Sequence, residues 1–247
     1  MGVAVAVVSG KGGTGKTSFV ANVGMALARA GHRVLCLDGD IGLRNLDMAL
    51  GLSDRTLMDF TDVIAGRCSL TEAVVPHPLQ EGLALLTAPV RLETGLRTAE
   101  FVDLVNEIRA QYDYCLLDSA AGLGEAFWLT TAGADRAIVV TTTDPASLRD
   151  AQRTVMELDR LPRDAVHMVV NRCRKKLLRA LRQTVDDAMD TAGLPLLGIV
   201  PEDEEVPLAL GRGIPLLLTG NRCAAVAYEN IAGRITGRRV PLMRLRR

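Results

Sequence analysis

The sequence predicts a single-domain α/β fold in which a mostly parallel, twisted sheet carries helices on both faces. Three observations lead to this prediction. Short apolar runs recur along the chain, at residues 3–8, 34–37, 83–86, 114–117, 137–141, 166–170 and 196–200. Segments with helical periodicity separate them, among them 18–30, 99–110 and 147–158, and this alternation is typical of parallel strands joined by right-handed crossovers. Hydrophobic residues make up 48% of the chain but aromatic residues only 3%, as expected for aliphatic strands buried between helices.

The chain is organised as one domain. Its 247 residues fit one large α/β domain, and neither an internal repeat nor a linker rich in Pro, Gly or Ser divides them. We therefore expect a domain over residues 1–240, followed by a short basic tail over residues 241–247.

Charge and cysteine content restrict the classes of partner and the compartment. The formal net charge is zero, so binding to nucleic acid or membrane would have to come from a local patch. The five cysteines are far apart and form no C-x-x-C pair, which favours a reduced, cytoplasmic protein. A glycine-rich loop begins too early for a signal peptide to precede it, and the apolar runs are shorter than the roughly 20 residues of a membrane span.

That loop, residues 9–18 with the sequence S-G-K-G-G-T-G-K-T-S, predicts a nucleoside triphosphate site of the P-loop type. It lies between the first apolar run and a helical segment, so backbone N–H groups and the positive end of the helix can meet phosphate oxygens. Lys16 can reach the terminal phosphates, and the Thr17 hydroxyl can bind Mg²⁺. The predicted nucleotide-binding residues of the loop are Gly10, Gly12, Gly13, Thr14, Gly15, Lys16, Thr17 and Ser18.

Carboxylates at the ends of two later apolar runs complete the predicted site. In an open parallel sheet, ligands bind beyond the carboxyl ends of the strands. Asp38 and Asp40 end the second run, and Asp118 ends the fourth in a Walker B pattern. Mg²⁺ prefers oxygen ligands and retains water, so we expect Asp38 and Asp118 to hold the ion or its water shell. Asp40 is expected to position the attacking water.

Two stretches of sequence resemble a known family. The pattern K-G-G-T-G-K-T, with the additional Lys11, resembles the deviant Walker A motif of the MinD/ParA ATPases. The string D-G-D-I-G-L-R-N-L-D at 38–47 resembles the switch I region of the MinD branch of that family. The resemblance covers essentially the whole chain up to about Leu242.

The resemblance implies an ATP- and Mg²⁺-dependent ATPase that acts as a spatial switch in division-site placement. It implies that the chain forms a homodimer with ATP, in which Lys11 reaches the phosphates of the partner's ATP, so the catalytic residues would be Lys11, Lys16 and Asp40. It also assigns Asn171 to the adenine edge and Pro201 to the face of the base. A division inhibitor and an ATPase-activating protein would bind a face that includes Arg44, Asn45, Arg149 and Asp150.

Two departures from the family pattern affect these expectations. The family usually reads D-x-P-A-G-I-E after its Walker B strand, whereas this chain has Ala120 in place of the proline and its acid one place later, at Glu125. The chain stops about where an amphipathic extension would begin, so we expect membrane contact to be weak or absent and DNA binding to be unlikely. The expected location is cytoplasmic, with peripheral contact on the inner face of the cell membrane as the second location.

Two alternative functions remain at this point. A ParA-type ATPase that positions DNA or cargo shares the loop but not the 44–47 string R-N-L-D. A nucleotide-gated recruitment module without hydrolysis is compatible with the altered loop at 120–125. Separately, the segment 172–182 reads as a basic amphipathic helix, which could contact anionic lipid, DNA or an acidic partner. We favour the interpretation as a solvated helix face over the core.

Overall fold

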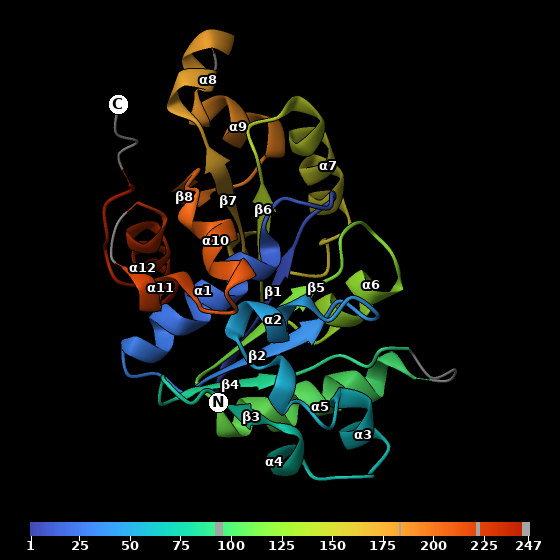
Figure 1. Cartoon of the computed structure of the whole chain (residues 1–247). Coiled ribbons are helices and arrows are strands. Elements are labelled where there is room, and N and C mark those ends of the chain that lie inside the picture. The colour runs from blue at the N-terminus through green and yellow to red at the C-terminus, as the bar shows by residue number, and fades with distance from the viewer. Residues whose placement is uncertain (92–95, 183, 221–222, 244–247) are drawn as a thin grey trace.

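The computed structural model describes residues 1–91, 96–182, 184–220 and 223–243, and over these residues it confirms the predicted α/β architecture (Figure 1). One eight-stranded sheet runs through the molecule in the order β3-β4-β2-β5-β1-β6-β7-β8. The strands are β1 Val3–Val8, β2 Val34–Gly39, β3 Val75–Pro76, β4 Leu83–Leu86, β5 Tyr114–Ser119, β6 Arg136–Thr141, β7 Val166–Cys173 and β8 Leu196–Pro201.

The sheet is parallel except at one edge. Every pairing from β4 to β8 is parallel, whereas the two-residue β3 pairs antiparallel with β4. The seven apolar runs of the sequence correspond to the seven parallel strands. The eighth strand, β3, was not predicted because two residues are too short to produce a periodic apolar pattern.

Side chains of successive strand residues point to opposite faces and build separate cores. In β1, Val5 and Val7 belong to one hydrophobic cluster, whereas Ala6 and Val8 belong to another across the sheet. The first face is covered by α1 (Lys16–Arg29), α2 (Asn45–Leu50), α10 (Glu205–Gly211), α11 (Leu216–Thr219) and α12 (Ala224–Ile235). This alternation explains why strands that look uniformly apolar in sequence need helices on both sides.

Helices from the middle of the chain cover the second face. They are α3 (Phe60–Ile64), α4 (Leu70–Ala73), α5 (Thr98–Gln111), α6 (Glu125–Ala132), α7 (Pro145–Met156), α8 (Lys175–Leu181) and α9 (Val185–Ala192). Two short 3₁₀ turns, Ser53–Arg55 and Arg163–Ala165, complete the elements described. Among the helices that the structure describes, none combines the length and apolar character needed to cross a bilayer.

Two predicted positions differ from the structure. Asn171 was expected to follow its strand but lies inside β7, which continues to Cys173 with an irregular register after Val170. The basic run predicted as one helix over 172–182 is divided between the end of β7 and α8. Of the tail, Pro241–Met243 carries no helix and Met243 packs against the core, while Arg244, Leu245, Arg246 and Arg247 lie outside the described residues.

Candidate functional site

The P-loop, defined here as residues 9–18, connects the end of β1 to the start of α1 at the carboxyl edge of the sheet. Gly15 caps α1 with a φ of 89°, a left-handed conformation that favours glycine. A Cβ at Gly15 would also lie 2.4 Å from the Asn171 amide nitrogen, and one at Gly10 would lie 2.5 Å from the Asp150 carbonyl oxygen. Steric contact therefore requires glycine at these two positions.

Lys16 is buried at the base of this loop. Its ammonium donates a hydrogen bond of 2.8 Å to the Ser9 hydroxyl, which in turn donates to the Lys11 carbonyl at 2.8 Å. Burial lowers the pKa of Lys16, while the nearby carboxylates of Asp118 and Asp40 raise it. Ser9 thus holds the ammonium group of Lys16 at the base of the loop. The spacing of the sequence did not predict this contact.

Asp118 is the most unusual carboxyl group of the site. It lies at the end of β5, paired in register with Asp38 of β2, and is almost fully buried. Neither carboxyl oxygen has a hydrogen-bond partner among the described residues. Burial raises the pKa of Asp118 to about 8, the Asp38 carboxylate adds to the rise, and Lys16 and the Thr17 hydroxyl reduce it. An unpartnered buried carboxyl beside a cation-binding loop is a position that a bound cation or its water would satisfy.

The residues present therefore fit an Mg²⁺ ion, provided that a nucleotide is bound. Within the described residues no three His, Cys, Asp or Glu side chains gather as a metal site. An ion at this position would complete its shell with the Thr17 hydroxyl, phosphate oxygens and water, as Mg²⁺ commonly does.

Asp38 differs from Asp118 because its oxygens already have partners. They accept backbone hydrogen bonds from Asp40 at 2.9 Å and Leu46 at 3.1 Å, so Asp38 folds the segment that follows β2. Burial nevertheless raises the pKa of Asp38 to about 6. Its predicted part in the Mg²⁺ shell stays a prediction. Asp40 is half-buried and open to the loop, and burial raises its pKa while Lys16 lowers it.

Asn171 binds the P-loop itself. Its side-chain nitrogen donates to the Thr14 carbonyl at 2.7 Å, across 157 residues of sequence. Pro201 ends β8 in register with Cys173, so it lies one strand away on the same edge. The structure brings Asn171 to the loop and places Pro201 at the same edge of the sheet. Their predicted contacts with a base stay predictions.

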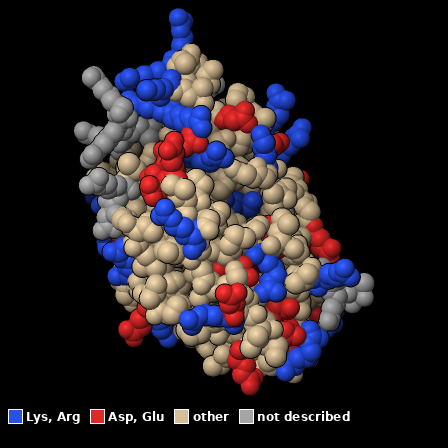
Figure 2. All heavy atoms as spheres, viewed as in Figure 1, with Lys and Arg blue, Asp and Glu red and all other residues tan. Residues whose placement is uncertain are grey.

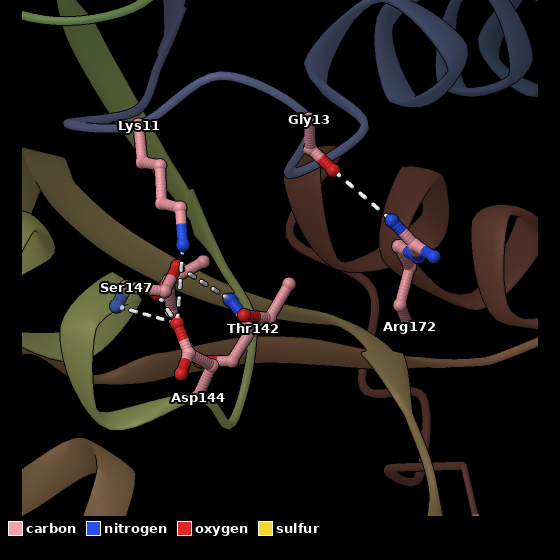
Figure 3. Close-up of polar contacts among 7 residues, drawn as sticks. Lys11, Gly13, Thr142, Asp144, Ser147 and Arg172 are labelled. Atoms are coloured by element: carbon pink, nitrogen blue, oxygen red, sulfur yellow. Dashed lines mark hydrogen bonds and ion pairs between the residues drawn. The ribbon is translucent and has the colours of Figure 1, made fainter.

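Lys11 is tied to its own chain. Its ammonium lies 3.3 Å from Asp144 Oδ2, and both side chains are half exposed (Figure 3). Asp144 is the N-cap of α7 and also accepts from the Ser147 N–H at 3.1 Å. These bonds, first the one from Ser147 and then those from Lys11, hold the pKa of Asp144 below its usual range. The additional lysine of the loop is thus held at the start of α7.

Arg172 approaches the loop from the other side. It has a φ of 52°, and its guanidinium donates to the Gly13 carbonyl at 3.3 Å (Figure 3). The same guanidinium also donates to Glu202 at 3.2 Å. Together with Lys11, Gly13 and Asp144 it lines an open cleft of about 400 Å³ above the loop. Ser9, Asp144 and Arg172 are the contacts that the sequence analysis missed.

The altered segment after β5 packs onto the loop. Gly122, with a φ of 85°, donates its N–H to the Ser9 carbonyl at 3.0 Å. Glu125 lies exposed in the first turn of α6, where the helix dipole favours an acid. This position accounts for Glu125 as an ordinary helix start. Ala120 is half-buried and makes no contact that assigns it a function.

These features define a nucleotide-binding protein of the P-loop class. The family model described as the CobQ/CobB/MinD/ParA nucleotide binding domain matches residues 5–216. The septum site-determining protein MinD of Bacillus subtilis (strain 168) is 39% identical over 246 residues, which are 98% of this chain and 92% of that protein. The chain therefore belongs to the MinD/ParA family of ATPases, in its MinD branch, as its two motifs predicted.

Solved structures agree with this assignment. MinD from the MinC:MinD cell division protein complex of Aquifex aeolicus is 35% identical, with a TM-score of 0.91 and coverage of 98% of both chains. MinD of Pyrococcus horikoshii, solved in complex with Mg-ADP, is 28% identical, with a TM-score of 0.82 over 95% of this chain and 96% of that one. The predicted ATPase class and the nucleotide-with-Mg²⁺ cofactor are thus confirmed at the level of the family.

Proposed function

We propose that this ATPase dimerises on binding ATP and acts as a switch in division-site placement, recruiting a division inhibitor and being reset by an activator. The observation that carries the catalytic part is Asp118, a buried carboxyl without a partner beside Lys16 and Thr17. The identity of 39% with a septum site-determining protein supports the biological part.

Each residue of the site has a definite task in this proposal. Lys16 exchanges its bond with Ser9 for oxygens of the terminal phosphates and stabilises the charge that develops on them. Backbone N–H groups of the P-loop hold the other phosphates. Asp40 accepts a hydrogen bond from the attacking water and aligns it, so catalysis depends on positioning and charge neutralisation. Bound Mg²⁺ would neutralise phosphate charge, with Thr17 and Asp118 holding it or its water.

Lys11 links the reaction to association. In the single chain it is engaged by Asp144, and both side chains are half exposed at the mouth of the cleft. In the proposed dimer it leaves Asp144 and contacts phosphate oxygens bound to the partner protomer. ATP binding and dimerisation are then coupled through the same charges, and hydrolysis releases the pair.

The recruitment of an inhibitor is supported by the Aquifex aeolicus protein, which was solved as a complex with MinC. We propose that α7 contributes to this surface and to that of the activator. Arg149 is exposed there, whereas Asp150 packs its backbone over Gly10. Arg149→Glu is therefore a better test of partner binding than a change at Asp150, which would disturb the P-loop.

We further propose a cytoplasmic location with weak, ATP-dependent contact with the membrane, and a domain that ends near residue 240. Leu242 is 41% exposed, while Met243 packs against the core, so little of the described tail is available as an anchor.

One assay distinguishes the proposed function from its two rivals. Phosphate release from Mg-ATP is measured over a range of protein concentrations, together with binding to duplex DNA. We expect specific activity to rise with concentration, since only dimers turn over, and no DNA binding. A recruitment module would bind ATP without releasing phosphate. A ParA-type protein would bind DNA in ATP and release it as salt rises.

A further inference from the structure

The helix α8 exposes two of its three leucines. It follows β7 at the carboxyl edge and extends beyond the end of that strand (Figure 1). Leu178 packs into the core, but Leu177 is 42% and Leu181 48% exposed, and Leu177 also lines the rim of the cleft above the P-loop. These two residues are four apart, so they lie on the same side of the helix. The sequence predicted that the apolar side of this helix lies on the core, but of its three leucines only Leu178 does so.

The same segment carries a dense positive charge. Residues 172–182 contain six Lys or Arg and no acid, in a chain with a net charge of zero. Arg172 and Arg174 pair with Glu202, whereas Lys176, Arg179 and Arg182 are exposed and form no ion pair within the described part of the chain. Figure 2 shows Lys and Arg gathered at the end of the molecule that α8 occupies in Figure 1.

The stability of the helix does not explain this arrangement. The N-cap, Arg174, makes no capping bond, and Lys175 and Lys176 occupy the first turn, where the helix dipole disfavours cations. The next helix, α9, has the usual arrangement, a capping box between Thr184 and Asp187. The position of Lys176 in the first turn is therefore unfavourable for the helix, whereas Arg179 in the last turn suits the helix dipole. Lys176, Arg179 and Arg182 stay available to a partner outside the chain.

We propose that α8 docks on an anionic lipid bilayer, with Leu177 and Leu181 in the headgroup boundary and Lys176, Arg179 and Arg182 on lipid phosphates. Basic helices with exposed aliphatic residues bind in this way. Nucleic acid is a poorer match because its charged phosphate backbone would pair with the cations but leave the exposed Leu177 and Leu181 without an apolar partner. The inference rests on the proposed peripheral membrane contact and names the surface that makes it.

The test measures co-sedimentation with phosphatidylcholine vesicles, with and without phosphatidylglycerol, in Mg-ATP. Lys176→Glu/Arg179→Glu removes the charge, and Leu181→Gln removes the exposed leucine that does not line the cleft above the P-loop. The matched control is Arg160→Glu/Arg163→Glu, with the same spacing and charge change, on exposed residues that precede β7 at the opposite edge of the sheet. Thermal unfolding verifies that each variant is folded.

We expect the wild type to bind vesicles that contain phosphatidylglycerol, with affinity that falls as salt rises. Each α8 variant should lose at least about tenfold in affinity for these vesicles. The charge variant replaces two cations that anionic headgroups attract, and the leucine variant loses apolar surface that the headgroup boundary would bury. The control should remain within about twofold, and Lys176→Glu/Arg179→Glu should keep the wild-type ATP turnover.

Three results would overturn the inference. The first is vesicle binding that is absent in the wild type or unchanged in both α8 variants. The second is a loss with the charge variant but none with the leucine variant, which would indicate a purely electrostatic polyanion site. The third is duplex DNA binding that depends on α8. Failure of the proposed ATPase cycle would show separately, as absent phosphate release by the wild type.

Discussion

Asp118 is the site residue that most clearly lowers the stability of the fold. Its carboxyl group is buried without a hydrogen-bond partner among the described residues, beside Asp38 on the neighbouring strand. A buried group of this kind destabilises the folded protein when it is ionised. Natural proteins retain such groups where a ligand satisfies them, so the cost indicates function at this position.

A pH-dependent stability follows from this burial. The pKa of Asp118 is about 8 in the folded protein against a reference value of 3.8. Between these values the folded state binds a proton that the unfolded state lacks, so the stability contributed by this group falls as pH rises. We therefore compare the thermal unfolding midpoints of Asp118→Asn and the wild type, both without nucleotide. The midpoint of Asp118→Asn should rise relative to that of the wild type as the pH goes from 5 to 8.

The control for this measurement is Asp190→Asn, which changes an exposed carboxyl on α9 in the same way. Its midpoint difference from the wild type should not vary with pH. A pH-independent difference for Asp118→Asn as well would show that the carboxyl is already satisfied and would remove the argument for a cation there.

Asp40 gives a second prediction at the residue scale. Its carboxyl is half-buried next to Lys16, and it contributes no ligand to the phosphate cradle. Asp40→Ala should therefore keep ATP binding and lose the alignment of water, which reduces turnover by about 10²-fold or more. The variant should accumulate as an ATP-bound dimer in light scattering. Turnover at the wild-type rate would exclude Asp40 from the mechanism.

Some residues of the site can be predicted from the sequence, and others cannot. Lys16 and Thr17 are predictable because the loop is contiguous and its spacing is specific. Arg172 is not, because the Gly13 carbonyl that it binds lies 159 residues away and its conformation, with φ at 52°, has no signal in the sequence. The partner of Lys11 was missed for the same reason, at a separation of 133 residues.

At the scale of elements, the start of α7 is the part that restrains Lys11, the residue on which the proposed switch depends. Asp144 caps this helix and at the same time holds Lys11 at 3.3 Å. Exposed ion pairs contribute little, about 0.2–1 kcal/mol each. The contact is therefore strong enough to orient the lysine and weak enough to be exchanged for phosphate.

Asp144→Asn separates these two functions of the residue. Asparagine still caps α7, but it no longer attracts the ammonium group of Lys11. With two such pairs per dimer, the dissociation constant of the ATP dimer should fall roughly two- to thirtyfold. Sedimentation velocity in Mg-ATP measures the change. The control is Asp159→Asn, an exposed acid beyond the far end of α7. An unchanged or weaker dimer in Asp144→Asn would contradict the restraint.

Element prediction succeeded where burial imposes a pattern. The parallel strands were located by their apolar runs because both faces are covered, and three of the long helices were located by periodicity. The edge strand β3 gives no pattern over its two residues. The prediction of one helix over 172–182 with its apolar face on the core was wrong. Three leucines among cations predict such an inward face, whereas the fold buries only Leu178.

At the scale of the whole molecule, the topology brings the site together. Strands β1, β2, β5 and β7 lie next to or near one another in the order β2-β5-β1-β6-β7, although β1 ends at Val8 and β7 begins only at Val166. Their carboxyl ends deliver the P-loop, Asp40, Asp118 and Asn171 to one edge. Two such edges facing each other would place each Lys11 opposite the partner's phosphates, which is the central claim of the proposed switch.

The most direct test of that claim is static light scattering of Lys11→Ala, Lys16→Ala and the wild type with Mg-ATP, combined with measured ATP affinity. We predict that the wild type forms dimers and that Lys16→Ala binds no ATP. Lys11→Ala should bind ATP with the affinity of the wild-type monomer and remain monomeric. Dimers of Lys11→Ala that form with ATP at wild-type concentrations would contradict the action of Lys11 across the interface.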